Sequence, residues 1–328
     1  MKKFVLKVIG FGTIVVLVFG IWSGMLFYLE VTSYARESKM PDGTVVAVCG
    51  DSQTELGLQP RIWPHFFNFS QSAIQLDQIE LKTLDLLDRN PGMLRTLLID
   101  ISPRKLAVQS IDCPLIEARN ASKRFLLHLL HPKESRRSLD GVIVLFRDII
   151  LVQRTKKAWS RLLKGKPYKS SLGCPGAADV RTEEQVAENR RNLLARPPVM
   201  GFRDHLDRVC ASMDEHAAEM VEWGPASITS KTSRCIHDIV ALVKSRGVTP
   251  VLITPPWHGE LRARVPESLL DNFRTTMREI ARDSDVVWLD YLEMPFADDE
   301  WRDGNHLNAH GAVRFTECVR RDVENLRF

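Results

Sequence analysis

The chain has 328 residues, of which 44% are apolar, a fraction that is ordinary for a globular protein and excludes disorder along the whole chain. Its 45 basic and 41 acidic residues give a formal charge of +4, and no basic stripe carries interleaved aromatic residues, so nucleic acid is not an expected partner. The six cysteines form no Cys-x-x-Cys motif and no paired zinc spacing, so we predict no metal site.

The N-terminal segment 4–29, FVLKVIGFGTIVVLVFGIWSGMLFYL, contains a single charged residue, Lys7. About 20 apolar residues are enough to cross a bilayer as a helix. Because Lys2 and Lys3 precede the segment, its amino end is expected to stay in the cytoplasm. We therefore predict a single-pass transmembrane anchor over residues 1–29, with the rest of the chain extracytoplasmic, on the periplasmic or cell-surface side.

A cleaved signal peptide is the alternative interpretation of this segment. Such a peptide has an apolar region of about 7–15 residues followed by a cleavage site of small residues. The apolar segment here is longer, and the sequence YLEVTSYA at 28–35 is a poor cleavage site, so an uncleaved anchor is favoured. The polar residues 30–43, which end in Pro-Asp-Gly, are predicted to form a linker.

Residues 44–328 are predicted to form an α/β domain. Short apolar runs alternate with helical patterns, which is typical of a parallel sheet with helices on both faces. Gly247 is a candidate C-cap and Asn308 a candidate N-cap. We expect a flavodoxin-like three-layer sandwich with about five strands, at 44–49, 65–70, 95–101, 248–254 and 285–290, and with helices at 72–89, 231–247, 266–283 and 308–326.

The region 104–200 interrupts this alternation and is predicted to be a largely helical insertion. Helical patterns occur at 121–130 and 141–165, and a further helix is expected after the insertion at 204–223. Arg147 and Asp148 lie inside the apolar part of 141–165, which argues against a second membrane span. In an exported domain two disulfides are conceivable, Cys113 with Cys174 or Cys210 with Cys235.

Ligands of open parallel sheets bind at the carboxyl ends of the strands. Ser52 follows the first strand in a Gly-Asp-Ser sequence, and WRDGNHLN near the C-terminus contains Asp303 and His306, three residues apart. A nucleophilic serine needs an imidazole that accepts its proton and a third group that orients the imidazole. Each motif alone is common in turns, but together they predict Ser52 as nucleophile, His306 as base and Asp303 as orienting acid.

In these motifs the chain resembles the SGNH, or GDSL-like, hydrolase superfamily. The resemblance rests on GDSQTELG at 50–57 and DGNHLN at 303–308, and it covers about 44–103 and 248–320. It implies a Ser-His-Asp triad, an acyl-enzyme intermediate and no cofactor. NFSQSA at 68–73 is similar to the second block of the family, which places Ala73 where the family uses a glycine amide as an oxyanion donor.

The third block of the family departs from its usual form here. The family places an oxyanion-stabilising asparagine after the next strand, whereas LLIDISPRKL at 97–106 has none and offers Ser102 or Arg104 instead. The oxyanion candidates are therefore Ser52, Ala73, Ser102 and Arg104. Loss of one oxyanion donor costs about 100–1000-fold in rate, so the departure bears on catalytic efficiency.

The long interruption and the apolar N-terminus are similar to membrane-anchored SGNH-like proteins of bacterial envelopes, and ITPPWH at 253–258 resembles their Pro-rich segment. This resemblance implies an esterase or O-acyltransferase that acts on acyl esters of cell-envelope glycans or another small ester, with envelope proteins as further partners. The alternative is a catalytically degenerate SGNH fold that binds glycan or a partner protein. Trp257 and Trp301 are either a platform for stacking sugars or packing residues.

Overall fold

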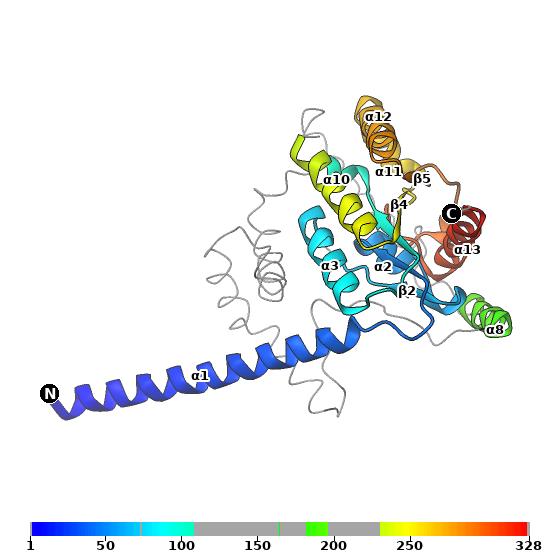
Figure 1. The fold of residues 1–328 in the computed structure, drawn as a ribbon. Coiled ribbons are helices and arrows are strands. Elements are labelled where there is room, and N and C mark those ends of the chain that lie inside the picture. Colours follow the sequence, from blue (N-terminus) through cyan, green and yellow to red (C-terminus); the bar gives the residue numbers. More distant parts are fainter. Residues whose placement is uncertain (1, 73, 108–163, 165–181, 196–229, 327–328) are drawn as a thin grey trace. The chain divides into compact units, whose positions relative to one another are not determined.

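A computed structural model describes residues 2–72, 74–107, 164, 182–195 and 230–326 (Figure 1). The backbone contacts divide the chain into two units. One contains helix α1 (Lys2–Glu37), and the other contains Ser38–Cys113 and Cys174–Phe328. The predicted helices at 121–130 and 204–223, and all of 141–165 except Lys164, lie outside the described residues.

Helix α1 extends through residues 30–37, so this part of the predicted linker is helical. These residues contain no glycine or proline, and the first strong break in the sequence is the Pro41–Gly43 turn. There Thr44 N donates to Pro41 O at 3.2 Å and Gly43 has a φ of +82°. Among the described residues no helix is both long and apolar enough to cross a membrane, so the predicted transmembrane helix is not found there.

The second unit is built on one sheet of five parallel strands. They are β1 (Val46–Cys49), β2 (Phe66–Asn68), β3 (Thr96–Asp100), β4 (Thr249–Thr254) and β5 (Val287–Asp290). Their order is β2-β1-β3-β4-β5, and every neighbouring pair is parallel. This is the order of flavodoxin-like folds. The α/β prediction and the positions of all five strands are confirmed, although each strand is shorter than its apolar run.

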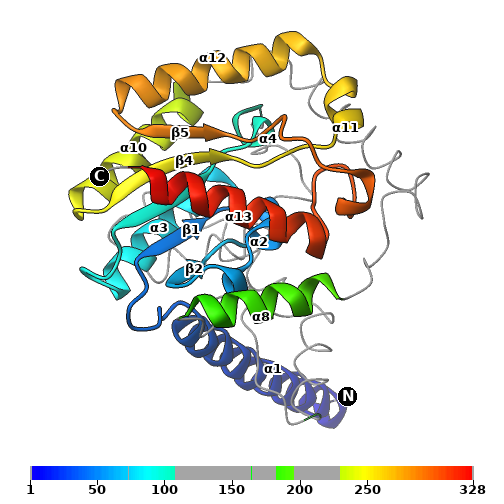
Figure 2. The same cartoon turned by 90° about the vertical axis from the view of Figure 1, so that its right-hand side faces the viewer.

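Helices cover both faces of the sheet. Figure 2 shows α13 crossing in front of the strands, while α3 and α10 lie behind them and pack against each other. The longer helices of this unit are α3 (Leu76–Arg89), α8 (Glu183–Leu194), α10 (Ser230–Ser245), α12 (Glu267–Asp283) and α13 (Ala309–Asn325). Shorter ones are α2 (Ser52–Gly57), α4 (Pro103–Ala107), α11 (Gly259–Arg264) and the 3₁₀ turns η1 (Pro60–Ile62) and η5 (Asp298–Glu300).

Helix α13 shows how the apolar periodicity produces the core. Phe315, Val319 and Val323 recur at helical spacing, and all three are buried in the cluster that includes strand residues such as Val48 and Val251. The predicted caps are confirmed. Asn308 Oδ1 accepts from the amides of His310 and Gly311 at 2.9 and 3.2 Å, and Gly247 follows α10 with a φ of +71°.

Two helix predictions need correction. Helix α3 begins at Leu76 rather than near residue 72, because Gln75 N is capped by the side chain of Gln78 at 3.0 Å. Helix α8 was not predicted, although Thr182 and Gln185 form a reciprocal capping box at its start. The Thr-x-x-Gln spacing was a readable signal.

Cys235 is a free thiol within hydrogen-bonding distance of Glu80 Oε2, at 3.7 Å, so the pair with Cys210 does not form. The other suggested pair, Cys113 with Cys174, lies outside the described residues.

Candidate active site

A tight turn carries Ser52 from the end of β1 into α2. Asp51 is the N-cap of α2, and its Oδ1 accepts from Gln53 N at 2.8 Å. Ser52 is therefore the first helical residue, where the helix offers its backbone N–H no acceptor. A side chain at Gly50 would overlap Thr54 Oγ1 and lie 2.5 Å from Asp100 Cβ, so the turn requires glycine there.

The loop between η5 and α13 brings His306 to Ser52. The distance from His306 Nε2 to Ser52 Oγ is 2.8 Å, and His306 Nδ1 lies 2.8 and 2.9 Å from the two carboxylate oxygens of Asp303. Asp303 Oδ1 also accepts from the amides of Asn305 and His306, at 3.1 and 2.9 Å. The three residues singled out in the sequence thus form one continuous chain of hydrogen bonds.

The electrostatics of the pair suit an orienting carboxylate. Burial acts to raise the pKa of Asp303, but the hydrogen bond and charge of His306, together with two backbone amides, hold that pKa below its usual range. Asp303 is therefore ionised at neutral pH and fixes the proton of His306 on Nδ1. The other nitrogen, Nε2, is left to accept a proton from Ser52, which is the geometry required of a general base.

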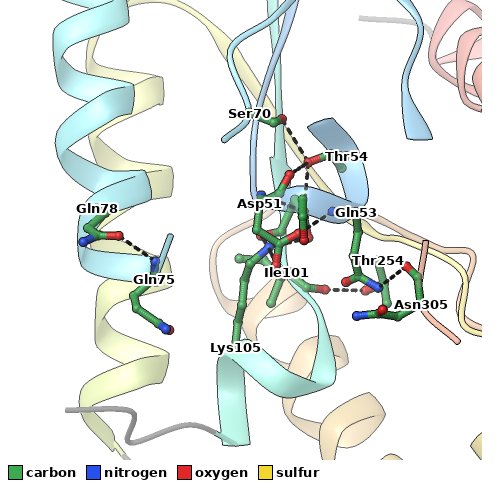
Figure 3. A network of polar contacts seen from close by, with 12 residues as sticks. Asp51, Gln53, Thr54, Ser70, Gln75, Gln78, Ile101, Lys105, Thr254 and Asn305 are labelled. Atoms are coloured by element: carbon green, nitrogen blue, oxygen red, sulfur yellow. Dashed lines mark hydrogen bonds and ion pairs between the residues drawn. The ribbon is translucent and has the colours of Figure 1, made fainter. Parts of the chain in front are cut away.

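Contacts from two directions hold the His306 loop in place. Gln53 Nε2 donates to Asn305 O at 3.2 Å, which ties the loop to the turn that carries Ser52 (Figure 3). From the end of β4, His258 N donates to Gly304 O at 3.0 Å. The relative position of Ser52 and His306 is thus fixed by these two contacts to the backbone of the loop as well as by their own hydrogen bond.

A buried ion-pair cluster lies next to the Ser52 turn (Figure 3). Lys105 Nζ lies 3.1 Å from Asp51 Oδ2 and 2.7 Å from Asp100 Oδ1, and it donates to Asp100 O at 3.1 Å. Asp100 Oδ2 accepts from Asp51 N at 3.1 Å and from Thr54 Oγ1 at 2.9 Å. The cluster therefore joins the ends of β1 and β3 through Asp51, the residue that precedes the candidate nucleophile.

Burial within this cluster shifts both carboxyl groups. Burial, and then the neighbouring Asp51 carboxylate, raise the pKa of Asp100 to about 7. Burial also acts to raise the pKa of Asp51, but the Lys105 ammonium and the Gln53 amide outweigh it and hold that pKa below its usual range.

A small cavity of about 30 Å³ adjoins Ser52. Ser102, Arg104, Trp257 and Leu261 line it together with Ser52. Ser102 is 1% exposed and Trp257 is 3% exposed, and neither Ser102 Oγ nor Trp257 Nε1 has a hydrogen-bond partner among the described residues. A buried polar group without a partner costs about 1–3 kcal/mol, so these two atoms call for an explanation.

The structure describes three of the four candidate oxyanion donors. Ser52, Ser102 and Arg104 border one cavity, whereas Ala73 lies outside the described residues. In the block at 68–73, Asn68 is buried and has a structural role, because its Nδ2 donates to Thr54 O and Leu58 O at 2.9 and 2.8 Å.

The interpretation of two tryptophans as a sugar platform is wrong, since Trp257 and Trp301 are 3% and 1% exposed. Trp301 packs edge-on against His258, with a centroid distance of 5.4 Å. Within the described part of the chain, no group of three or more His, Cys, Asp or Glu side chains is arranged to hold a metal ion.

Sequence reasoning missed the supporting residues Gln53, Lys105 and Asn305. The tertiary fold determines which residues Gln53 and Lys105 contact, and nothing in the sequence around these two residues indicates the contacts.

No protein-family model matches the sequence, and no curated protein sequence is significantly similar to it. Among solved structures, a candidate acylhydrolase from Bacteroides fragilis aligns with a TM-score of 0.42 and 10% identity, over 92% of this chain and 99% of its own. Protein YxiM from Bacillus subtilis aligns with a TM-score of 0.34 and 9% identity, over 88% of this chain and 59% of its own. Similarity at this level assigns no activity, so the chemistry must be argued from the residues of the site.

Proposed function

We propose that the protein is a serine esterase or O-acyltransferase of the SGNH type. The observation that carries this proposal is the distance of 2.8 Å from His306 Nε2 to Ser52 Oγ, with His306 Nδ1 held on Asp303. Two segments more than 250 residues apart meet in this arrangement. A surface Asp-His pair without a catalytic role would not need a serine hydroxyl at the remaining nitrogen.

In the proposed acylation step, His306 Nε2 takes the proton of Ser52 Oγ as that oxygen attacks the carbonyl carbon of an ester. The new C–O bond forms while the carbonyl π electrons move to the carbonyl oxygen, giving a tetrahedral oxyanion. Collapse of this intermediate restores the carbonyl and breaks the bond to the alcohol oxygen, which receives the proton from His306. The product is an acyl-Ser52 ester and a free alcohol.

The second substrate decides between the two activities. Water attacking the acyl-enzyme gives a carboxylic acid, while a carbohydrate hydroxyl gives a new ester; His306 acts as base in both cases. We propose acyl esters of cell-envelope glycans, or a similar small ester, as the substrate class.

The proposed location is membrane-attached and extracytoplasmic, with envelope proteins as partners. It is supported by the sequence alone, through the apolar segment 4–29 and the lysines before it. The test is fractionation of cells that produce the full chain, with protease added to intact cells or spheroplasts. Recovery in the membrane fraction, with the C-terminal part degraded, is expected; a soluble, protease-protected chain would contradict the location.

Labelling with a fluorophosphonate probe tests the nucleophile. The full chain is expected to be labelled, the Ser52→Ala variant is not, and the Ser245→Ala variant is labelled like the parent because Ser245 lies exposed at the end of α10. Labelling that persists in Ser52→Ala would refute Ser52 as the nucleophile.

A second candidate function is a degenerate SGNH fold that binds glycan or a partner, which the missing asparagine of the third block favours. Hydrolysis of p-nitrophenyl acetate separates the two. An enzyme is expected to lose turnover in His306→Ala, whereas a binding protein would show the same background rate with and without that substitution.

A further inference from the structure

The two unpartnered donors beside Ser52, the Ser102 hydroxyl and the Trp257 indole, follow two neighbouring strands whose ends are joined by hydrogen bonds. Ser102 follows β3, and Trp257 follows β4. Ile101 N donates to Ile253 O at 2.8 Å, and Thr254 Oγ1 donates to Ile101 O at 2.8 Å, so the ends of these strands are tied just before the two residues. Ser102 and Trp257 are both among the residues that line a cavity adjoining Ser52.

Burial without a partner distinguishes the Trp257 indole from another indole on the same sheet. Trp288 Nε1 donates to Thr254 Oγ1 at 2.9 Å. Trp257 Nε1 is buried and, within the described residues, has no acceptor. A buried donor of this kind gains its hydrogen bond only when an acceptor enters the cavity.

We propose that Trp257 is a catalytic residue, with its Nε1–H and the Ser102 hydroxyl donating to the carbonyl oxygen of the acyl group on Ser52. This rests on the proposed function and deepens it. The indole N–H takes the place of the side-chain amide that is missing from LLIDISPRKL. Like an amide, it is a neutral donor that needs no proton transfer of its own.

The position of Trp257 is fixed relative to the general base. Trp257 N donates to Leu292 O at 3.2 Å, and the next residue, His258, donates through its amide to Gly304 O at 3.0 Å in the His306 loop. A donor held in this way needs little reorganisation when charge develops on the substrate oxygen. Preorganised donors of this kind contribute most to stabilising an oxyanion.

The test is Trp257→Phe in the full chain, which removes the N–H and keeps an aromatic ring. Turnover of p-nitrophenyl acetate is expected to fall at least tenfold in kcat, and toward the ~100-fold typical of a lost oxyanion donor, with KM changed less than about threefold. The thermal midpoint is expected to fall only by the packing lost when the buried indole is replaced by a smaller ring, because no hydrogen bond is lost within the protein. Trp288→Phe is the matched control: it is expected to lower the thermal midpoint and to leave kcat within about twofold.

The outcomes separate this inference from the proposed function. If the parent chain shows no turnover that depends on Ser52, the proposed function fails and the inference with it. If the parent is active and Trp257→Phe retains kcat within threefold, only the inference is overturned. Should Trp257→Phe fold poorly, Ser102→Ala provides the decision: a kcat loss of tenfold or more at an unchanged thermal midpoint supports the donor pair, and an unchanged kcat refutes it.

Discussion

Replacing Lys105 by methionine is expected to destabilise the protein strongly. Methionine has nearly the same length as lysine but no charge and no N–H groups. The substitution therefore removes one ion from the buried cluster and leaves its partners, Asp51 and Asp100, in place. The Lys105 side chain is 3% exposed and that of Asp100 is 0% exposed, so water cannot replace the lost contacts.

The size of the effect follows from the contacts. Lys105 Nζ faces three acceptors at 2.7 to 3.1 Å, and two of them belong to Asp100. Breaking a buried ion pair by removing one partner costs about 3–5 kcal/mol of unfolding free energy. A domain with a total stability of about 5–15 kcal/mol would lose a large part of it.

Urea unfolding of the full chain, followed by tryptophan fluorescence, measures this loss. Arg190→Met is the matched control, because Arg190 pairs with Glu317 at 2.5 Å but both side chains are more than 40% exposed. Exposed pairs contribute about 0–1 kcal/mol. The double variant Lys105→Met/Asp100→Asn, which removes the stranded charge, is expected to be more stable than Lys105→Met alone.

Two results would refute this reasoning. One is a loss below about 1 kcal/mol in Lys105→Met, equal to that of the exposed control. The other is a double variant that is less stable than the single one, because the penalty would then not arise from an uncompensated carboxylate.

Three further predictions concern the same unit. The pKa of Asp100 is raised from 3.8 to about 7, so the folded state binds the proton of this carboxyl group more tightly than the unfolded state does. The protonated Asp100 therefore contributes fully to the stability of the fold below pH ~4, and this contribution is lost as the pH rises to about 7. Asp100→Asn is expected to flatten this part of the pH–stability curve, measured by urea unfolding. Gly50→Ala places a Cβ against Thr54 Oγ1 and should cost about 1–3 kcal/mol of unfolding free energy and lower kcat, and wild-type stability and turnover in this variant would contradict the requirement for glycine. Asn308→Ala removes the cap of α13 and should cost about 1–2 kcal/mol in the same assay, with a loss below 0.5 kcal/mol arguing against the cap.

The five parallel strands and the meeting of Ser52 with His306 could both be expected from sequence, whereas the order of the strands was not read from the apolar pattern. Apolar runs marked the five strands, and a parallel sheet places the carboxyl ends of its strands at one edge. Two motifs more than 250 residues apart are therefore brought together by topology alone. Their chemical types, a hydroxyl and an Asp-x-x-His pair, already suggested which groups would meet.

The supporting residues could not be predicted in the same way. Lys105 sits in a short polar stretch after β3, where a lysine is ordinarily solvated. Its burial depends on Asp51, which comes from a neighbouring strand end, and on the backbone oxygen of Asp100. Trp257 was open to two interpretations because local sequence does not report whether an indole at a strand end is exposed. Both cases depend on side-chain packing between strands, which periodicity does not encode.

The carboxylates near Ser52 give a reason why hydrogen-bond donors to the substrate oxygen would be needed there. Lys105 is a single cation between two carboxyl groups, so when Asp100 is ionised the cluster carries a formal charge of −1, and the carboxylate of Asp303, which contacts His306, adds a further negative charge. These negative charges oppose the development of negative charge on a substrate oxygen. The opposing field is strongest above pH ~7, where Asp100 loses its proton. Donors aimed at that oxygen would offset this field, and the residues that line the cavity beside Ser52 include the cation Arg104 and Trp257, whose buried indole N–H has no partner among the described residues.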